Sequence, residues 1–333
     1  MDSFTSHFKA WIPRQTCGLL CAALFAWVAC VFYLFHMNPE VTHYLQGEKI
    51  KDGWARKMTA EHGAKIVVYG GSSCQFSIDG ERMLRKFNLP TVNDGRSAGM
   101  GASMMTESEL ARVRSGDTLI IALEPGTLTG SIDPTSLAAQ FSATAGHPEW
   151  VLRPALGIGS INLFEFAVDL RPGGRFLFTM LGKRLMGRPA FRYKLSDIRA
   201  SGWAQTDVRM SFEGSPGHGD HLSKPGRQLV VRLRDWCQSN QVRVAYSLPW
   251  AYSPVDQAAQ FRRHNACFLG DMAALVPVLK DPGLGADTNR DDFADTNFHL
   301  ATPAAEARTD QLARQILNWD LWTVDELTAL AKP

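Results

Sequence analysis

An uninterrupted apolar segment near the N-terminus constrains this chain most. Residues 17–36 read CGLLCAALFAWVACVFYLFH, and no aspartate, glutamate, lysine or arginine occurs between Arg14 and Glu40. A helix of about 20 residues, at 1.5 Å per residue, is long enough to cross the hydrocarbon core of a bilayer. The residues that follow, HMNPEV, lack the small-residue cleavage site of a signal peptide. We therefore predict a transmembrane helix over residues 17–36, preceded by a cytoplasmic N-terminus over residues 1–16.

The charges that flank this segment predict its orientation. Lys9 and Arg14 precede it closely, whereas the first basic residue after it is Lys49. Short loops rich in lysine and arginine stay in the cytoplasm, and a long domain can cross the membrane whatever its charge. We expect a single-pass protein of the inner (cytoplasmic) membrane whose domain faces the periplasm or the cell exterior.

The composition of the remaining chain is that of an ordinary globular protein. The 333 residues are 45% hydrophobic and 20% charged, with a net charge of +2. Because no run of five or six like charges occurs, nothing in the sequence indicates a nucleic-acid partner. The cysteines form no C-x-x-C pair, so we expect no metal site and no cofactor. Cys237 and Cys267 either pair in an oxidising compartment or remain separate thiols.

After residue 64, short β-branched runs alternate with segments of helical periodicity. The predicted strands are 65–69, 91–93, 118–123 and 242–248, and the predicted helices are 78–87, 102–113, 225–238 and 303–317. This alternation predicts an α/β fold in which a parallel sheet lies between helices on both faces, as a three-layer domain over residues 64–333. Residues 37–63 are expected to form a polar stalk.

The strand–helix alternation stops between residues 126 and 220. This stretch is rich in glycine, proline and aromatic residues, and we interpret it as an insertion into the domain. Its aromatic side chains either face sugar rings or form a second small core. They include Trp150, Phe164, Phe166, Phe176, Phe178 and Trp203.

Polar residues gather where parallel strands would end, which is where open α/β sheets bind ligands. Ser72 and Ser73 follow the first predicted strand, and Asp295 and His299 precede the last predicted helix. A serine becomes nucleophilic when a histidine removes its proton and a carboxylate orients that histidine. Backbone amides near glycines can stabilise the oxyanion that follows. The sequence therefore offers the parts of a serine-dependent acyl-transfer site.

These residues resemble the sequence blocks of the SGNH (GDSL-type) hydrolases and acyltransferases. Gly71-Ser72-Ser73 is similar to the Gly-Ser-Ser form of the first block, which implies that Ser73 is the nucleophile. Asn93-x-Gly95-x-x-x-Gly99 resembles the second block, which implies that Asn93 lies in the substrate site and that the amides of Gly95 and Ser73 hold the oxyanion. Asp295-x-x-x-His299 resembles the last block, with His299 as the base and Asp295 as its partner.

Two features depart from the family pattern. The third block normally supplies an asparagine to the oxyanion hole, but Glu124-Pro125-Gly126 stands here, so that donor is missing or comes from elsewhere, such as Asn162. The spacing from Asp295 to His299 is one residue longer than usual, which leaves Asp291 and Asp292 as alternative acids.

The resemblance implies a flavodoxin-like sheet and a membrane-anchored enzyme that adds or removes O-acyl groups on a cell-envelope or secreted polysaccharide. The expected partners are that polysaccharide, the membrane and an integral-membrane acyl-donor protein. The alternative is a non-catalytic module with the same fold that binds glycan and organises a polysaccharide biosynthesis complex.

Overall fold

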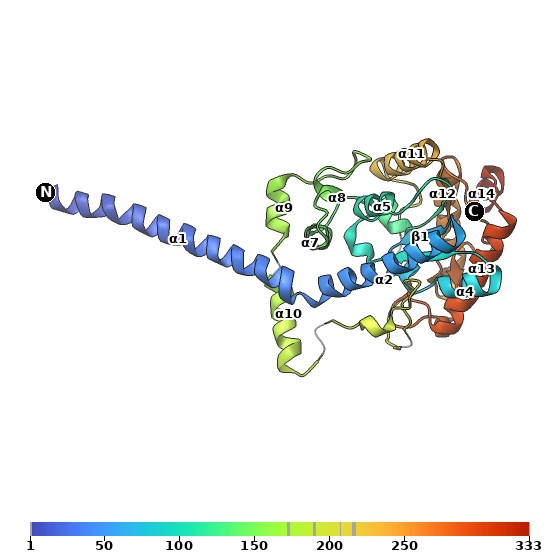
Figure 1. The fold of residues 1–333 in the computed structure, drawn as a ribbon, viewed down its shortest axis with the longest axis horizontal. Coiled ribbons are helices and arrows are strands. Elements are labelled where there is room, and N and C mark those ends of the chain that lie inside the picture. Colours follow the sequence, from blue (N-terminus) through green and yellow to red (C-terminus); the bar gives the residue numbers. More distant parts are fainter. Residues whose placement is uncertain (1, 172–173, 189–190, 207, 215–217, 333) are drawn as a thin grey trace.

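A computed structural model describes residues 2–171, 174–188, 191–206, 208–214 and 218–332. A single long helix, α1 (Asp2–Met37), projects from a rounded domain formed by the rest of the chain (Figure 1). Its segment Gln15–Met37 has a mean hydropathy of 2.3, and only 6% of its most apolar window is buried by the rest of the chain. This helix is therefore long, apolar and free enough of the domain to cross a membrane.

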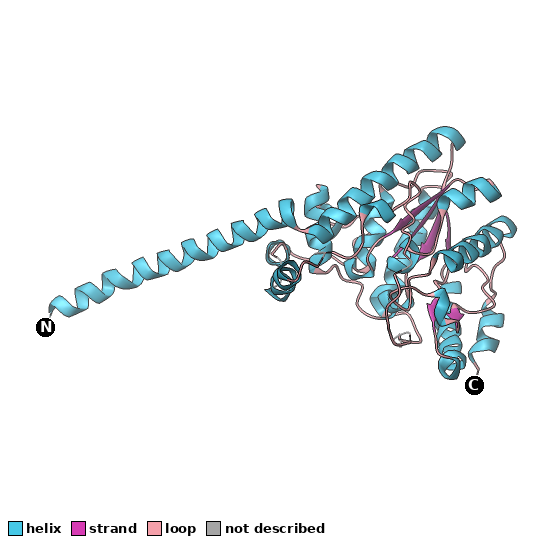
Figure 2. Cartoon of the chain, turned by 90° about the horizontal axis from the view of Figure 1, so that it is seen from below, coloured by secondary structure: helices cyan, strands magenta, loops and turns pink. Residues whose placement is uncertain are grey.

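The domain is built on a four-stranded parallel sheet with the order β2-β1-β3-β4 (Figure 2). The strands are β1 (Ile66–Gly70), β2 (Thr91–Gly95), β3 (Thr118–Ala122) and β4 (Arg243–Tyr246). Gly70 is in register with Gly95 and Ala122, so the carboxyl ends of three strands lie level with one another. The predicted strands and the α/β class are confirmed.

Alternate residues of the two central strands, β1 and β3, point into two different cores. Val67 and Tyr69 belong to the larger core, whereas Ile66 and Val68 belong to a smaller one on the other face of the sheet. Burial on both faces explains why β1 and β3 are largely apolar instead of alternating between apolar and polar residues. The larger core receives α5 (Ala102–Leu110), α11 (Lys224–Ser239) and α12 (Val255–Ala273), and the smaller core receives α4 (Gly80–Phe87) and α13 (Thr302–Asn318).

Residues 37–63 form a packed helix instead of the expected polar stalk. Asn38 caps α2 (Pro39–His62), which lies along β2, the edge strand of the sheet. The indole of Trp54 donates a hydrogen bond of 2.8 Å to the carbonyl of Thr91, and the amine of Lys51 donates to the carbonyl of Gly95. Side chains of α2 thus donate hydrogen bonds to carbonyl groups of β2, and they cover an edge that would otherwise be open to pairing with another strand.

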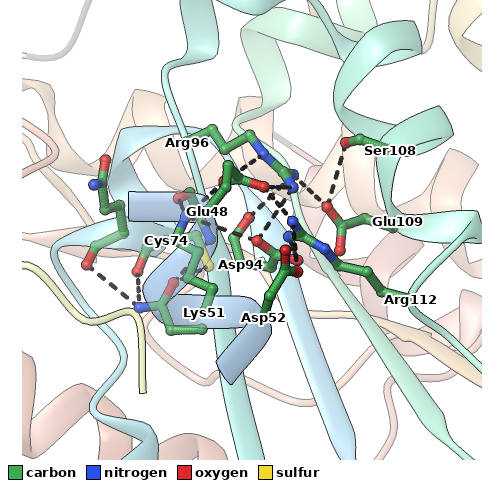
Figure 3. Close-up of polar contacts among 12 residues, drawn as sticks. Glu48, Lys51, Asp52, Cys74, Asp94, Arg96, Ser108, Glu109 and Arg112 are labelled. Carbon is green, nitrogen blue, oxygen red and sulfur yellow. Dashed lines mark hydrogen bonds and ion pairs between the residues drawn. The ribbon is translucent and has the colours of Figure 1, made fainter. Parts of the chain in front are cut away.

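A buried cluster of charges, the α2 charge cluster, joins this helix to β2 and α5. Figure 3 shows guanidinium groups lying between carboxylates of different elements. Arg96 pairs with Glu48 at 2.8 Å and also with Glu109, and Arg112 pairs with Glu48 and Asp94. We define the cluster as Glu48, Lys51, Asp94, Arg96, Glu109 and Arg112.

The pKa values of two glutamates in the cluster are shifted in opposite directions. Burial opposes ionisation of Glu48, but Arg112 and Arg96 outweigh it and lower the pKa of Glu48 to about 2. Burial raises the pKa of Glu109 well above its ordinary value, and nearby Asp94 adds to this increase. One Glu109 oxygen is also buried without a hydrogen-bond partner among the described residues. Glu48 therefore pairs with both arginines as a stabilised anion, whereas burial and Asp94 oppose ionisation of Glu109, which contacts Arg96 alone of the two.

Residues 126–220 contribute no strand to the central sheet among the residues that the structure describes. They hold α7 (Ser136–Ala145), α8 (Glu149–Leu152), α9 (Leu163–Asp169) and α10 (Gly174–Leu185), after a short α6 (Pro125–Thr129). The aromatic side chains of this insertion divide into two groups. Trp150, Phe166 and Trp203 pack into the domain, Phe164 and Phe178 are each 78% exposed, and the side chain of Phe176 lies outside the described part.

The chain ends in α14 (Val324–Ala331), which packs against α12. A second, two-stranded sheet joins β5 (Ala251–Tyr252) to β6 (Ala286–Asp287). Cys237 is buried within α11 and Cys267 is partly buried in α12, and both thiols are free. The structure therefore shows two separate thiols instead of a disulfide.

Candidate functional site

The candidate site begins at a tight turn after β1. Gly71 precedes the short helix α3 (Ser72–Gln75), which starts at the carboxyl end of the strand. A β-carbon on Gly70 would lie 2.2 Å from the carbonyl oxygen of Ala122, and one on Gly71 would lie 2.2 Å from a carboxylate oxygen of Glu124. The two glycines therefore let this turn approach the end of β3 more closely than any other residue would.

The two serines of this turn differ in exposure. Ser73 is 0% exposed, its amide donates a hydrogen bond of 3.0 Å to Glu124 Oε1, and its hydroxyl has no hydrogen-bond partner among the described residues. Ser72 is the first residue of α3 and is partly exposed. The predicted nucleophile, Ser73, is thus the less reachable of the two hydroxyls.

Asp295 and His299 form a hydrogen-bonded pair. His299 Nδ1 lies 2.8 Å from Asp295 Oδ1, and an isolated bridge between Phe293 and Leu300 closes the loop that holds both. Thr296 Oγ1 accepts the amides of Phe298 and His299, which accommodates the extra residue between acid and base. The structure therefore brings together the acid and the base that the sequence analysis places in one motif.

Two residues from the insertion complete the surroundings of Asp295. Arg192 Nη1 and the hydroxyl of Tyr193 each donate a 2.9 Å hydrogen bond to Asp295 Oδ2, and the same hydroxyl lies 3.2 Å from His299 Nδ1. Burial alone would raise the pKa of Asp295, but hydrogen bonds from His299, Arg192 and Tyr193 hold this pKa well below its usual range. Asp295 is thus an anion that fixes the Nδ1 side of the imidazole and directs Nε2 away from itself.

The alternative acids have other roles. The backbone carbonyl of Asp291 accepts a hydrogen bond from Arg209. Asp292 interacts with Asp287 and accepts the amide of Ala301 through its own carbonyl. Asp295 is therefore the carboxylate that partners His299.

An aromatic contact joins the α3 turn to this pair. The ring of Phe76, which directly follows α3, stacks on His299 with centroids 4.1 Å apart, and Tyr193 contacts the same ring at 5.0 Å. Phe76 comes four residues after Ser72 and three after Ser73, so both serines lie on the turn that touches the histidine. The structure thus places the serines and the Asp295–His299 pair in one region, although no hydrogen bond links the hydroxyl of Ser73 to His299 in the described chain.

The expected oxyanion donors have protein partners. The amide of Gly95 donates to Asn93 Oδ1 at 2.9 Å, and the amide of Ser73 is engaged by Glu124. Asn93 is fully buried, and its Nδ2 donates to the carbonyls of Cys74 and Ile78. Asn93 therefore fastens the α3 turn to β2, and the amide of Gly95, which the sequence analysis assigns to an oxyanion hole, is bonded to Asn93.

Asn162 does not replace the asparagine that is missing from the third block. Asn162 is exposed and caps α9 by accepting the amide of Glu165, so it supplies no donor to this site. Glu124, the residue that follows β3, instead turns its carboxylate toward the α3 turn. The site is closed in this structure, since His299 is only 5% exposed.

Sequence reasoning missed Arg192 and Tyr193. They reach Asp295 across 103 and 102 residues of chain, and no motif marks them. The position of Phe76 could have been predicted from its spacing, because a residue three or four positions after a strand-end serine lies on the same face of a helical turn.

Comparisons with known proteins give no relative from which a role could be taken. No protein-family model matches the chain, and a search of curated proteins finds no similar sequence. The functional assignment must therefore come from the geometry of the site.

Proposed function

We propose that this chain performs serine-dependent ester acyl transfer at the Asp295–His299 pair. The observation that carries the proposal is the stacking of Phe76 on His299, because it holds the serine-bearing turn after β1 against an imidazole whose other nitrogen is oriented by a buried carboxylate. That arrangement supports the proposal because acyl transfer of this type needs an oriented histidine near the hydroxyl that attacks.

The exposure of the two serines favours Ser72 over Ser73 as the nucleophile. An ester carbonyl must reach the attacking oxygen, and Ser73 is fully buried, whereas Ser72 is partly exposed. In the reaction, His299 would take the proton of the serine hydroxyl as the oxygen attacks the ester carbon. Asp295 would stabilise the resulting imidazolium, and the proton would pass to the leaving alcohol as the acyl–serine ester forms.

The resemblance to SGNH hydrolases and acyltransferases suggests the substrate class. A three-layer domain of that type on a membrane anchor, facing the periplasm or the cell exterior, fits an enzyme that adds or removes O-acyl groups on an envelope or secreted polysaccharide. An integral-membrane protein would then supply the acyl group. We propose transfer to a sugar hydroxyl in preference to hydrolysis, since an anchor keeps the domain beside a membrane-bound donor.

One observation favours a second candidate, a non-catalytic glycan-binding or assembly module. Both amides expected to stabilise an oxyanion are occupied by Asn93 and Glu124, and removal of such donors is costly to acyl-transfer enzymes. A fold that keeps the Asp295–His299 pair without an oxyanion hole would bind ligands but turn over esters slowly.

A fluorophosphonate probe separates the two candidates, because it labels only an activated serine. We expect the full chain in detergent or nanodiscs to be labelled, and we expect heat denaturation and His299→Ala to abolish labelling. An unlabelled, folded protein would support the binding module. For a labelled protein, incubation with a chromogenic ester and candidate oligosaccharides, followed by mass spectrometry, distinguishes acylated sugar from hydrolysis.

A further inference from the structure

An exposed apolar surface surrounds the base of the domain beside α1. On α10, Phe178 is 78%, Leu181 54% and Leu185 80% exposed, and these positions recur at intervals of three and four, so they share one helix face. On α9, Leu163 and Phe164 are 71% and 78% exposed. Large exposed apolar side chains that gather on a folded surface mark sites of contact with another protein or with a membrane.

The position of this surface identifies its partner. Figure 1 shows α9 and α10 on opposite sides of the end of α1 that meets the domain, both running across its axis. The indole of Trp27 donates a 3.0 Å hydrogen bond to the carbonyl of Ala167 in α9. Since Trp27 lies about 15 Å before Met37 along the helix, α9 contacts a part of the segment that would be surrounded by lipid.

The end of α1 is itself part of the domain. Leu34 is 1% exposed and belongs to the larger core, and Val31 packs against the same core. The apolar segment Gln15–Met37 therefore overlaps with the domain instead of being separated from it by a spacer. If α1 crosses a bilayer, the elements packed around residues 27–34 must lie at the level of the lipid.

We propose that α9 and α10 lie in the interface of the membrane that α1 crosses, with their exposed apolar side chains among the acyl chains. Lys183 and Arg184, in the last turn of α10, would lie at the level of the lipid headgroups. Interfacial helices of this kind combine one apolar face with lysine and arginine residues and lie parallel to the membrane plane. The exposed apolar side chains of α9 and α10 lie beside an α1 whose own apolar side chains are exposed, and one bilayer would cover all of them.

This placement connects the membrane to the candidate site. A few residues after α10, the chain supplies Arg192 and Tyr193 to Asp295, while Phe191 packs against the rings of His43 and Tyr44 on α2. The segment that surrounds Asp295 is therefore attached at one end to a membrane-bound helix. The membrane placement itself does not depend on the acyl-transfer chemistry.

The test measures the depth of single fluorophores in the full chain, reconstituted in lipid nanodiscs. A thiol-reactive, polarity-sensitive fluorophore is attached at Phe178→Cys or Phe164→Cys, in a background without the reachable native thiols of Cys17, Cys21, Cys30 and Cys267. Val255→Cys on α12 is the matched control, because Val255 is also 78% exposed but belongs to a helix on the side of the domain away from α1 (Figure 1). Phe25→Cys within α1 reports a lipid-embedded position.

Nitroxide groups on lipid acyl chains should quench the probes at positions 164, 178 and 25 at least about twofold more than the probe at position 255. Aqueous iodide should show the opposite order. Quenching of position 25 alone by lipid would overturn the proposal. Protection of position 178 from both quenchers, together with cross-linking between copies of the chain, would also overturn it and assign this face to self-association. Circular dichroism confirms that each variant is folded.

Discussion

At the residue scale, the two adjacent serines after β1 differ in the exposure of their hydroxyl groups. The hydroxyl of Ser73 is buried without a hydrogen bond among the described residues, while Ser72 is partly exposed at the start of α3. A buried hydroxyl with no partner contributes nothing to stability, so its removal should be tolerated. The turn therefore carries one partly exposed hydroxyl and one buried hydroxyl.

This difference predicts the outcome of two alanine substitutions. Ser72→Ala should abolish labelling by the fluorophosphonate probe, whereas Ser73→Ala should retain most of the labelling and should not lower the thermal unfolding midpoint. Gel fluorescence of the labelled variants and thermal unfolding provide the two measurements. The reverse pattern would return the nucleophile to Ser73, as the sequence motif predicts.

The carboxylate beside His299 gives a second prediction at this scale. Asp295→Asn should lower ester turnover by roughly 10³- to 10⁴-fold, because a neutral amide neither fixes the tautomer of the imidazole nor stabilises its cation. Tyr193→Phe, which removes one hydrogen bond from the same carboxylate, should cost about tenfold. Initial rates with a chromogenic ester measure both effects.

Asp292→Asn serves as the control for this substitution. Asp292 lies in the same segment but does not contact His299 in the described structure, so its loss should leave turnover within about twofold of the wild type. Greater damage from Asp292→Asn than from Asp295→Asn would show that the acid has been misassigned.

At the element scale, α2 shows how charged residues can occupy core positions. Six of the eight buried residues of this helix follow one another at intervals of three and four: Val41, Tyr44, Glu48, Lys51, Ala55 and Met58. This spacing places them on one face of a helix. The two central positions are charged. Glu48 pairs with Arg96 and Arg112, and Lys51 pairs with Asp94 and donates to the carbonyl of Gly95, so the apolar periodicity of the segment is interrupted.

The α2 charge cluster predicts unequal roles for two buried glutamates. Glu48→Gln should destabilise the domain by about 3–5 kcal/mol, because it leaves Arg96 and Arg112 short of an anionic partner in a buried place. Glu109→Gln should cost less than Glu48→Gln, because burial and Asp94 already oppose ionisation of Glu109 and glutamine has nearly the same shape. Denaturant unfolding of the full chain in detergent measures both, and equal losses would contradict this assignment.

The same cluster sets an acid limit on stability. The pKa of Glu48 is about 2 in the folded chain and about 4.3 in an unfolded one, so its contribution is fully present above pH ~4.5 and is lost as pH falls towards 2. The loss amounts to about 3 kcal/mol from this group, in the direction of acid unfolding. Unfolding midpoints measured between pH 6 and 2.5 should fall steeply for the wild type and less steeply for Glu48→Gln. Parallel curves would contradict this role of Glu48.

At the scale of the whole molecule, the orientation of α1 decides which compartment the site can serve. The basic residues before the apolar segment predict that the N-terminus stays in the cytoplasm and that the domain lies outside it. Protease added to right-side-out membrane vesicles should digest the domain and leave a protected fragment that contains α1. Inside-out vesicles should protect peptides containing Ser72 and Ser73. Protection of those peptides in right-side-out vesicles would exclude an envelope polysaccharide as substrate.

The sequence by itself determined the features that depend on local periodicity and composition. The apolar run of α1, the four strands of the sheet and the helices α4, α5, α11 and α13 were all predictable, because each buries a continuous run or a regular face of apolar residues. The pairing of Asp295 with His299 was predictable for a similar reason, since the two residues lie four positions apart on one short loop.

Only the tertiary structure decided which polar groups contact one another across long stretches of chain. The side-chain amide of Asn93 donates to the carbonyl of Cys74, Glu124 accepts the backbone amide of Ser73, and the hydroxyl of Tyr193 donates to Asp295 from the insertion. None of these contacts has a signature in the sequence, because a hydrogen bond needs one donor and one acceptor at about 3 Å and places no demand on the residues between them. The packing of α2 against β2 was decided in the same way, by cations and anions that become neighbours only after the sheet and its helices have assembled.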